Sequence, residues 1–128
     1  MSVRKSQPPD LAAAMQVTEE YFGPTIRTGE SSYLHTGNSH FEVRVVPIDE
    51  VKCFSRGPGV PGINRPRAFS ILLAVETGVP LPPVNVYPLI PQQGDFKYEL
   101  YHGYHRFHLS HALGYSHLPI AINFASEA

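Results

Sequence analysis

The sequence has almost no cysteine and no long run of apolar residues. Its single cysteine, Cys53, excludes an internal disulfide and favours a reducing compartment. A membrane-spanning helix needs about 18 consecutive apolar residues, and no run in the sequence approaches that length. The N-terminus also shows no apolar segment of signal-peptide length. We therefore expect a cytoplasmic protein without a membrane partner.

The chain also carries few charges, and the two signs nearly balance. Charged residues make up 16% of the 128 residues, and the net charge is −1. A nucleic-acid-binding domain usually shows a basic stripe, so we do not expect a nucleic-acid partner. Hydrophobic residues make up 42%, which is typical of a globular domain. Arg56, Arg65 and Arg67 nevertheless form a local cluster of positive charge.

Thirteen prolines and the lack of an internal repeat predict short elements joined by fixed turns. We interpret residues 1–40 as an N-terminal helix, starting after Asp10 and running to about Tyr21, followed by an irregular arm. Residues 41–128 are expected to form a small α+β domain, with a mixed β-sheet and packed helices. The elements predicted there are strand 41–48, irregular segment 52–67, helix 68–78, hairpin 82–102, helix 105–113 and strand 117–124.

The last predicted helix has apolar residues on two faces. Leu109, Ala112 and Leu113 form one stripe at helical spacing, and Phe107 falls on the opposite side. Phe107 therefore needs a second cover. We expect that cover from residues 1–40 or from a second copy of the chain, as a homodimer formed through the N-terminal arm.

The most informative stretch is HGYHRFHLSH, in which Gly103 separates a predicted strand from a predicted helix. The first turn of a helix presents unpaired N–H groups and the positive end of the helix dipole, a geometry that binds phosphate. His105 and Arg106 lie in that turn and would add donors for an anion. Cations are disfavoured at this end of a helix unless an anion is present, so their placement favours an anion site. Gly103 would let the backbone turn sharply and let a ligand approach closely.

A metal site is the alternative interpretation of this histidine-rich stretch. His102, His105, His108 and His111 recur every three residues, so His108 and His111 could share an ion. At that spacing the row drifts by roughly 60° per step around the helix, and four imidazoles cannot converge on one ion. We therefore predict no metal held by protein ligands, whereas a Mg²⁺ ion held by nucleotide phosphates is compatible with the site.

The segment PPVNVYPLIPQQGDFKYELYHGYHRFHLSHALGYSHLPIAI resembles the C-terminal part of ParB/sulfiredoxin-like nucleotide-binding domains. The shared pattern is P-P-[IV]-x-V, a hairpin, G-x-H-R, a helix with a glycine stop, and a closing strand. Upstream, VRVVPIDEV and RAFSILLAVETG are similar to the first strand of that family and the helix that follows it. The arm before Phe41 has no counterpart in the resemblance.

The resemblance implies a site for ATP or CTP, with His105 and Arg106 on the phosphates. It also implies contacts from a basic residue, and from a serine three positions later, on the preceding helix. Arg67 and Ser70 have that spacing in this sequence. The family's arginine in the loop after the first strand has a displaced counterpart in Arg56.

One departure from the family bears on activity. Sulfiredoxins carry their catalytic cysteine directly before the His-Arg pair, and this chain has Tyr104 there. Sulfinic-acid repair needs a thiolate, which a phenol with a pKa of about 10 cannot replace, so we do not expect a sulfiredoxin. Tyr104 beside the phosphates is still a candidate catalytic residue. Asp49 or Glu50 is a candidate general base, by similarity to a free-serine-kinase-like branch of the fold.

Two functional hypotheses follow from these residues. In the first, the domain binds a nucleotide or another phosphorylated small molecule, and as an enzyme it would transfer a phosphoryl group or hydrolyse the nucleotide. In the second, the same fold is a non-catalytic binding or assembly module, with a regulatory role or a place in a DNA-partition, plasmid or phage system. An enzyme would show turnover that depends on Arg106, whereas a module would bind without turnover.

Overall fold

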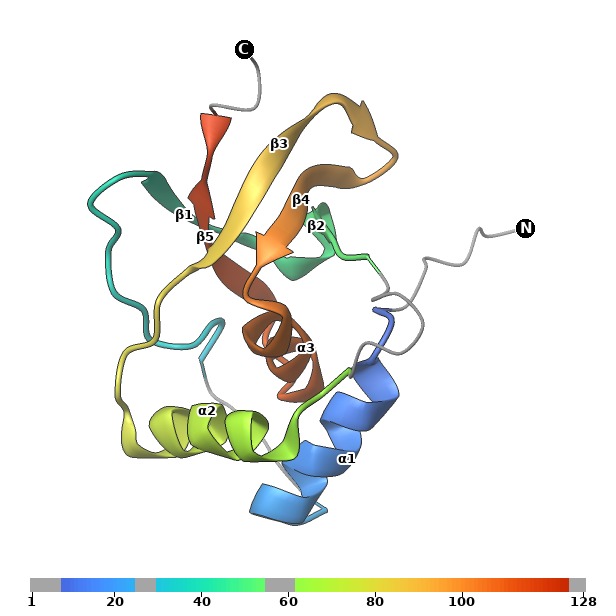
Figure 1. Cartoon of the computed structure of the whole chain (residues 1–128), viewed down its shortest axis with the longest axis vertical. Helices are drawn as coiled ribbons and strands as arrows, with labels where there is room; N and C mark the ends of the chain where they lie inside the picture. The colour runs from blue at the N-terminus through green and yellow to red at the C-terminus, as the bar shows by residue number, and fades with distance from the viewer. Residues whose placement is uncertain (1–7, 25–29, 55–61, 125–128) are drawn as a thin grey trace.

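The computed structural model describes residues 8–24, 30–54 and 62–124 (Figure 1). Within these ranges, no helix is both long enough and apolar enough to cross a membrane. The elements in chain order are α1 (Leu11–Phe22), β1 (Glu42–Pro47), the 3-10 helix η1 (Ile48–Glu50), β2 (Val51–Lys52), α2 (Arg65–Thr77), β3 (Val84–Gln93), β4 (Phe96–His102), α3 (Tyr104–Ala112) and β5 (His117–Ile122).

The strands form one mixed sheet in the order β1-β5-β3-β4-β2. β1 runs antiparallel to β5, and β3 runs antiparallel to β4. The β5–β3 and β4–β2 pairs are parallel. β1 and β2 therefore occupy opposite edges of the sheet, although only η1 separates them in the chain. The α+β class expected from the sequence is confirmed.

β2 is an element that the sequence did not predict. Lys52 falls in a stretch rich in Gly and Pro that we expected to be irregular, yet Val51 and Lys52 pair with Tyr98 and Glu99 of β4. The regular structure of these two residues comes from a partner strand far away in the sequence. The pairing also brings Cys53 and Phe54 close to the end of β4.

The core lies between the sheet and the α-helices, which gather on one side of it (Figure 1). β5 lies between β1 and β3, and its residues Leu118, Ile120 and Ile122 are at most 1% exposed. Leu72 of α2 and Leu109 of α3 belong to the same buried cluster. This packing of helices on one sheet face is the layer arrangement typical of small α+β domains.

α2 begins earlier than the sequence analysis expected, because Asn64 caps it. Asn64 Oδ1 accepts a hydrogen bond from the backbone N–H of Arg67 at 2.9 Å, so the helix starts at Arg65. Pro66 fits in the first turn, where a helix needs no N–H donor. The expected end is confirmed, since Gly78 follows the helix with a left-handed φ of +74°.

α1 packs along α3 and also contacts α2. Ala14 and Val17 of α1 share the core with Phe107 of α3, whose side chain is 2% exposed. The second cover for Phe107 therefore comes from the N-terminal helix of the same chain. Asp10 occupies the N-cap position of α1, but its side chain caps no N–H of that helix. Its carboxylate instead accepts a hydrogen bond from the hydroxyl of Tyr104.

Candidate functional site

Gly103 joins β4 to α3 in a conformation that other residues rarely adopt. Its φ is +106°, and a Cβ atom built on it would lie 2.6 Å from Cγ1 and 2.8 Å from Cβ of Val84. A side chain is therefore excluded both by the left-handed backbone and by the close approach of β3. We expected a ligand to approach the backbone here, whereas Val84 occupies the space next to Gly103 in the structure. Because of this turn, α3 begins at Tyr104, with only Gly103 between it and the end of β4.

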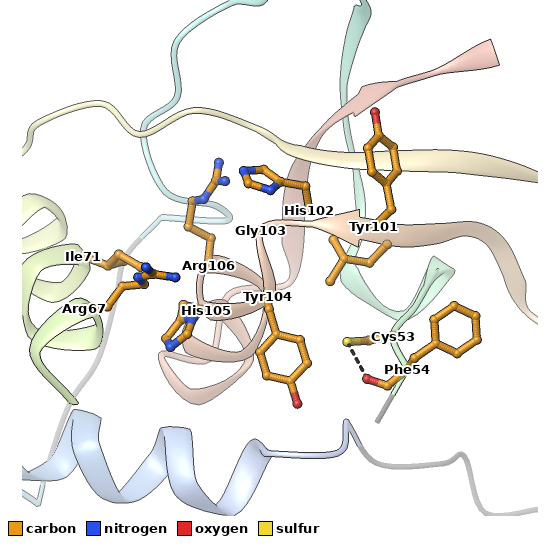
Figure 2. Close-up of a pocket in the computed structure, with 11 residues that line it drawn as sticks. Cys53, Phe54, Arg67, Ile71, Tyr101, His102, Gly103, Tyr104, His105 and Arg106 are labelled. Carbon is orange, nitrogen blue, oxygen red and sulfur yellow. Dashed lines mark hydrogen bonds between the residues drawn. The ribbon is translucent and has the colours of Figure 1, made fainter. Parts of the chain in front are cut away.

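The first turn of α3 forms part of the wall of a cavity of about 540 Å³ (Figure 2). This volume is in the range of small-molecule sites. Two guanidinium groups and two imidazoles belong to the wall, whereas none of its described residues is a carboxylate, so the wall is electropositive. The wall combines residues after β2, one face of α2, the end of β4 and the start of α3, namely Cys53, Phe54, Arg67, Ile71, Leu100, Tyr101, His102, Gly103, Tyr104, His105 and Arg106.

Arg67 is the most accessible cation of this wall. It lies exposed in the first turn of α2, and its guanidinium makes no hydrogen bond or ion pair within the described ranges. Figure 2 shows its side chain extending from α2 toward α3. Arg65, two residues earlier, is not part of the wall, because it donates to Glu20 at 2.8 Å and lies over the ring of Phe69. Of these two arginines, Arg67 is the one placed to meet an anion.

One nitrogen of the Arg106 guanidinium is hydrogen-bonded to the protein's own backbone. Its Nη1 group donates to the carbonyl oxygens of Pro82 at 2.6 Å and Pro83 at 3.0 Å. These bonds hold the segment before β3 against α3. The Tyr33 hydroxyl, which donates to the same Pro82 carbonyl, also lies beside the Arg106 guanidinium. The Nε and Nη2 groups bond no backbone carbonyl among the described residues, so part of the donor fork is left for a ligand in the cavity.

His105 is buried and links the starts of α2 and α3 through a hydrogen bond. Its side chain is 4% exposed, and Nε2 accepts a hydrogen bond from the backbone N–H of Asn64 at 2.8 Å. An imidazole that accepts through Nε2 is neutral and carries its proton on Nδ1. His105 therefore aligns the start of α2 with the start of α3. From the sequence, we expected His105 to donate to an anion.

Tyr104 takes the position directly before the His-Arg pair and lines the cavity. Its hydroxyl donates to the carboxylate of Asp10, and Figure 2 shows it pointing toward α1, away from Arg106. Its ring lies 4.3 Å from the ring of His108, centroid to centroid. His108 Nδ1 in turn donates to the Tyr104 carbonyl at 2.9 Å. Tyr104 thus connects the N-terminal helix to the start of α3.

Three other residues expected at the site are placed elsewhere or lie outside the described ranges. Ser70 is exposed on α2 but does not line the cavity, whereas Ile71, one helical turn after Arg67, does. Glu50, at the end of η1, forms an ion pair with Lys97 at 3.2 Å and is not part of the wall. Arg56 lies outside the residues that the structure describes.

Cys53 is a wall residue that the sequence analysis missed. We assigned it to an element separate from the His-Arg motif, but the parallel pairing of β2 with β4 brings it to the same cavity, together with Phe54. Its Sγ atom lies 3.6 Å from the Phe54 carbonyl oxygen (Figure 2). No local sequence signal predicts this placement, since β2 becomes a strand only through its distant partner.

The histidines of the predicted row lie in different surroundings. His102 is exposed at the cavity, and His108 is fully buried. Burial lowers the pKa of His111 to about 4, with a smaller contribution from His108 in the same direction and an opposing one from Asp49. Among the residues described, no three His, Cys, Asp or Glu side chains are grouped as a metal ion would require.

Comparisons with known proteins bear on the fold. No protein-family model and no curated protein matches the sequence. The structure is similar to the chromosome-partitioning protein ParB from Caulobacter crescentus complexed with CTP-gamma-S, with a TM-score of 0.51 and 18% sequence identity over 65% of this chain. It is also similar to sulfiredoxin from Arabidopsis thaliana, with a TM-score of 0.48 and 15% identity over 65% of this chain.

The two matches differ in how much of the known protein they cover. This chain spans 44% of the ParB chain and 85% of the sulfiredoxin chain. At these identities the likeness concerns the fold and not the activity. The element order, the mixed sheet and the structural match to ParB together show that this chain has a ParB/sulfiredoxin-like α+β fold.

Proposed function

We propose that the cavity at the start of α3 binds a nucleotide of the ATP or CTP type, or another phosphorylated small molecule, through its phosphate groups. The observation that carries the proposal is the charge of the wall. Arg67 and Arg106 border the first turn of α3, and none of the described wall residues is a carboxylate. The N–H groups of that turn and the helix dipole add to the positive potential.

The two arginines come from different helices, so they can hold phosphate oxygens from two directions. Guanidinium groups bind phosphate through paired N–H donors. Arg67 has its whole donor fork accessible, whereas Arg106 would use the groups that do not bind Pro82 and Pro83. We assign His105 a positioning role, because its Nε2 atom already accepts from Asn64.

The size and the chemistry of the cavity favour a nucleotide over inorganic phosphate. A volume of about 540 Å³ is far larger than one phosphate group needs. Phe54, Leu100 and Cys53 line a more apolar part that can contact a base. The ParB of similar structure is complexed with CTP-gamma-S, which supports a nucleotide. Because the described wall has no carboxylate, an accompanying Mg²⁺ ion would be held by phosphates and water.

Arginine substitution with a matched control tests the proposal. Binding of ATP, CTP, GTP and their diphosphates, with and without Mg²⁺, would be measured by thermal shift and calorimetry. We expect Arg67→Ala to weaken the best ligand by about tenfold or more, since a charge-assisted contact is lost. Arg65→Ala removes the same charge from the same helix turn outside the cavity and should change affinity by less than about twofold. No binding by any of these ligands would overturn the assignment of a nucleotide to the cavity.

The single cysteine provides an independent readout of occupancy. Because Cys53 lines the cavity and the chain has no other cysteine, alkylation by iodoacetamide reports on this site alone. A bound nucleotide should slow the alkylation of Cys53 in proportion to its occupancy. An alkylation rate that saturating nucleotide leaves unchanged would place the ligand elsewhere.

Turnover is a separate property of the same site. Glu50 does not line the cavity, and the hydroxyl of Tyr104, which does, is bound to Asp10. The geometry therefore supports binding more directly than general-base catalysis. We expect Glu50→Gln to leave nucleotide affinity unchanged. A nucleotide hydrolysis assay that showed turnover abolished by this variant would favour an enzyme over a binding module.

A further inference from the structure

A second cavity, of about 330 Å³, lies at the C-terminal end of α2. Its charge is opposite to that of the first cavity. Glu30 and Glu76 belong to its wall, and none of its described wall residues is a lysine, arginine or histidine. The carboxyl end of a helix is the negative end of its dipole, and the last turn of α2 contains no basic residue. The described wall therefore carries two carboxylates and no basic side chain of its own, and the nearest cation named by the contacts of the wall is Arg106, beside the Tyr33 hydroxyl.

Tyr115 contributes a hydroxyl group to this cavity that could bond to a ligand. Its side chain is 6% exposed and lines the cavity, and its hydroxyl makes no hydrogen bond within the described part of the chain. Burial raises the pKa of Tyr115, and the charge of Glu30 raises it further, so the hydroxyl lies within the field of that carboxylate. The hydroxyl oxygen is not fully enclosed, so it can be reached from the cavity and still lacks a hydrogen-bond partner among the described residues. A polar group entering the cavity would supply one.

The rest of the wall is aromatic and aliphatic. Tyr33 is buried, and its hydroxyl already donates to the Pro82 carbonyl at 2.7 Å, so it offers mainly its ring. Leu34 and Val79 are 56% and 53% exposed beside it. Carboxylates, phenol rings and exposed aliphatic side chains together suit an organic cation, whose charge and alkyl part need different contacts.

We propose that the second cavity binds a small organic ammonium compound. The carboxylates of Glu30 and Glu76 neutralise its charge, the Tyr115 hydroxyl accepts one of its N–H groups, and Leu34 and Val79 contact its alkyl part. Glu76 Oε1 accepts from Tyr21 at 2.7 Å, and a carboxylate has further acceptor positions for the ligand. A divalent metal ion fits less well, because it requires more oxygen ligands than two carboxylates and a phenol supply.

The test compares an amine with a neutral molecule of the same shape. Titration of n-butylammonium into the ¹⁵N-labelled full chain should shift the amide resonances of Gly78, Val79 and Tyr115, with a Kd of about 1–10 mM. 1-Butanol at the same concentrations should shift them much less. Equal effects of the two molecules, or no effect on these amides, would overturn the proposal.

Variants separate the charge from the apolar contacts. Glu30→Gln and Tyr115→Phe should each weaken n-butylammonium by about three- to tenfold, because each removes one polar contact with the ammonium group. Glu19→Gln makes the same charge change on the exposed face of α1 and should leave the affinity within about twofold. Glu30 is exposed, so Glu30→Gln keeps the test valid even if Tyr115→Phe impairs folding. Unchanged affinity in Glu30→Gln would contradict the proposal.

Discussion

Arg106 and His105 each combine a place in the cavity with a bond to the protein's own backbone. Arg106 holds the carbonyls of Pro82 and Pro83, and His105 accepts from the N–H of Asn64. Removing either side chain would therefore change folding and binding together. Arg67 has no such bond among the described residues, so its substitution isolates the effect on binding.

Gly103→Ala should destabilise the protein strongly. The new Cβ atom would lie 2.6 Å from Val84 Cγ1, and the backbone has a φ of +106°. We expect a loss of about 3 kcal/mol in the free energy of unfolding, measured by urea denaturation. Gly94→Ala is the control, because it also has a positive φ of +59° but no described atom within 4 Å of its Cβ position. It should cost only about 1 kcal/mol, and equal losses in the two variants would exclude the clash with Val84.

His111 should make stability depend on pH. Burial holds its pKa at about 4 in the folded protein, while the unfolded chain has the ordinary value of 6.5. Between these values the unfolded state binds the extra proton, so the free energy of unfolding falls as pH decreases from 6.5 toward 4. We expect a loss of roughly 1–3 kcal/mol from this group, reduced by its partial exposure. His111→Gln should flatten the profile in that window, and a profile with the same slope would contradict the assignment.

At the scale of elements, one loop residue aligns two helices at the cavity. The Asn64 side chain caps α2 through the N–H of Arg67, and its backbone N–H donates to His105 at the start of α3. The start of α2 is thereby held in place relative to α3. This arrangement explains why Arg67 of α2 and Arg106 of α3 face the same cavity.

Asn64→Ala should weaken the start of α2 without removing the bond to His105, which the backbone makes. The lost cap should cost about 1 kcal/mol in the free energy of unfolding. Asn64→Ser keeps an acceptor for the same N–H group and should stay within a few tenths of a kcal/mol of the parent protein. Chemical denaturation of both variants measures the difference. Equal stability of the alanine and serine variants would show that the side-chain cap is not significant.

At the scale of the whole molecule, α1 is part of the core, and one wall residue of each cavity donates to the same backbone carbonyl. The Pro82 carbonyl accepts from Arg106, which lines the electropositive cavity, and from Tyr33, which lines the negative one. Ala14 of α1 is fully buried with Phe107. The N-terminal helix therefore stabilises the surface on which α3 presents its first turn.

A pair of neighbouring substitutions tests the role of α1. Ala14→Asp places a carboxylate at a position that is 0% exposed and should cost about 3 kcal/mol or more, or prevent folding. Ala13→Asp makes the same change at an exposed position and should stay within about 0.5 kcal/mol. Thermal denaturation and dye binding to exposed apolar surface would measure both variants. If Ala14→Asp were as stable as Ala13→Asp, α1 would not belong to the core.

Local signals predicted the features that depend on a few neighbouring residues. The glycines at 78 and 103, the helix after Gly103 and the hairpin before it are as expected. A helix end or a tight turn is decided by the dihedral preferences and hydrogen bonds of adjacent residues, so the sequence is sufficient there. The start of α2 was placed too late, because the cap at Asn64 was not recognised.

By itself, the sequence determined the order of the three α-helices and the four longer strands, the junction at Gly103 and the presence of cations around it. Only the tertiary structure decided which side chains meet. It brought Cys53 to the cavity through the pairing of β2 with β4, pointed His105 at Asn64, paired Arg65 with Glu20 outside the cavity, and formed the second cavity beside Tyr115. The reason is physical: a turn depends on the dihedral angles of adjacent residues, whereas the walls of a cavity depend on packing between segments far apart in the chain.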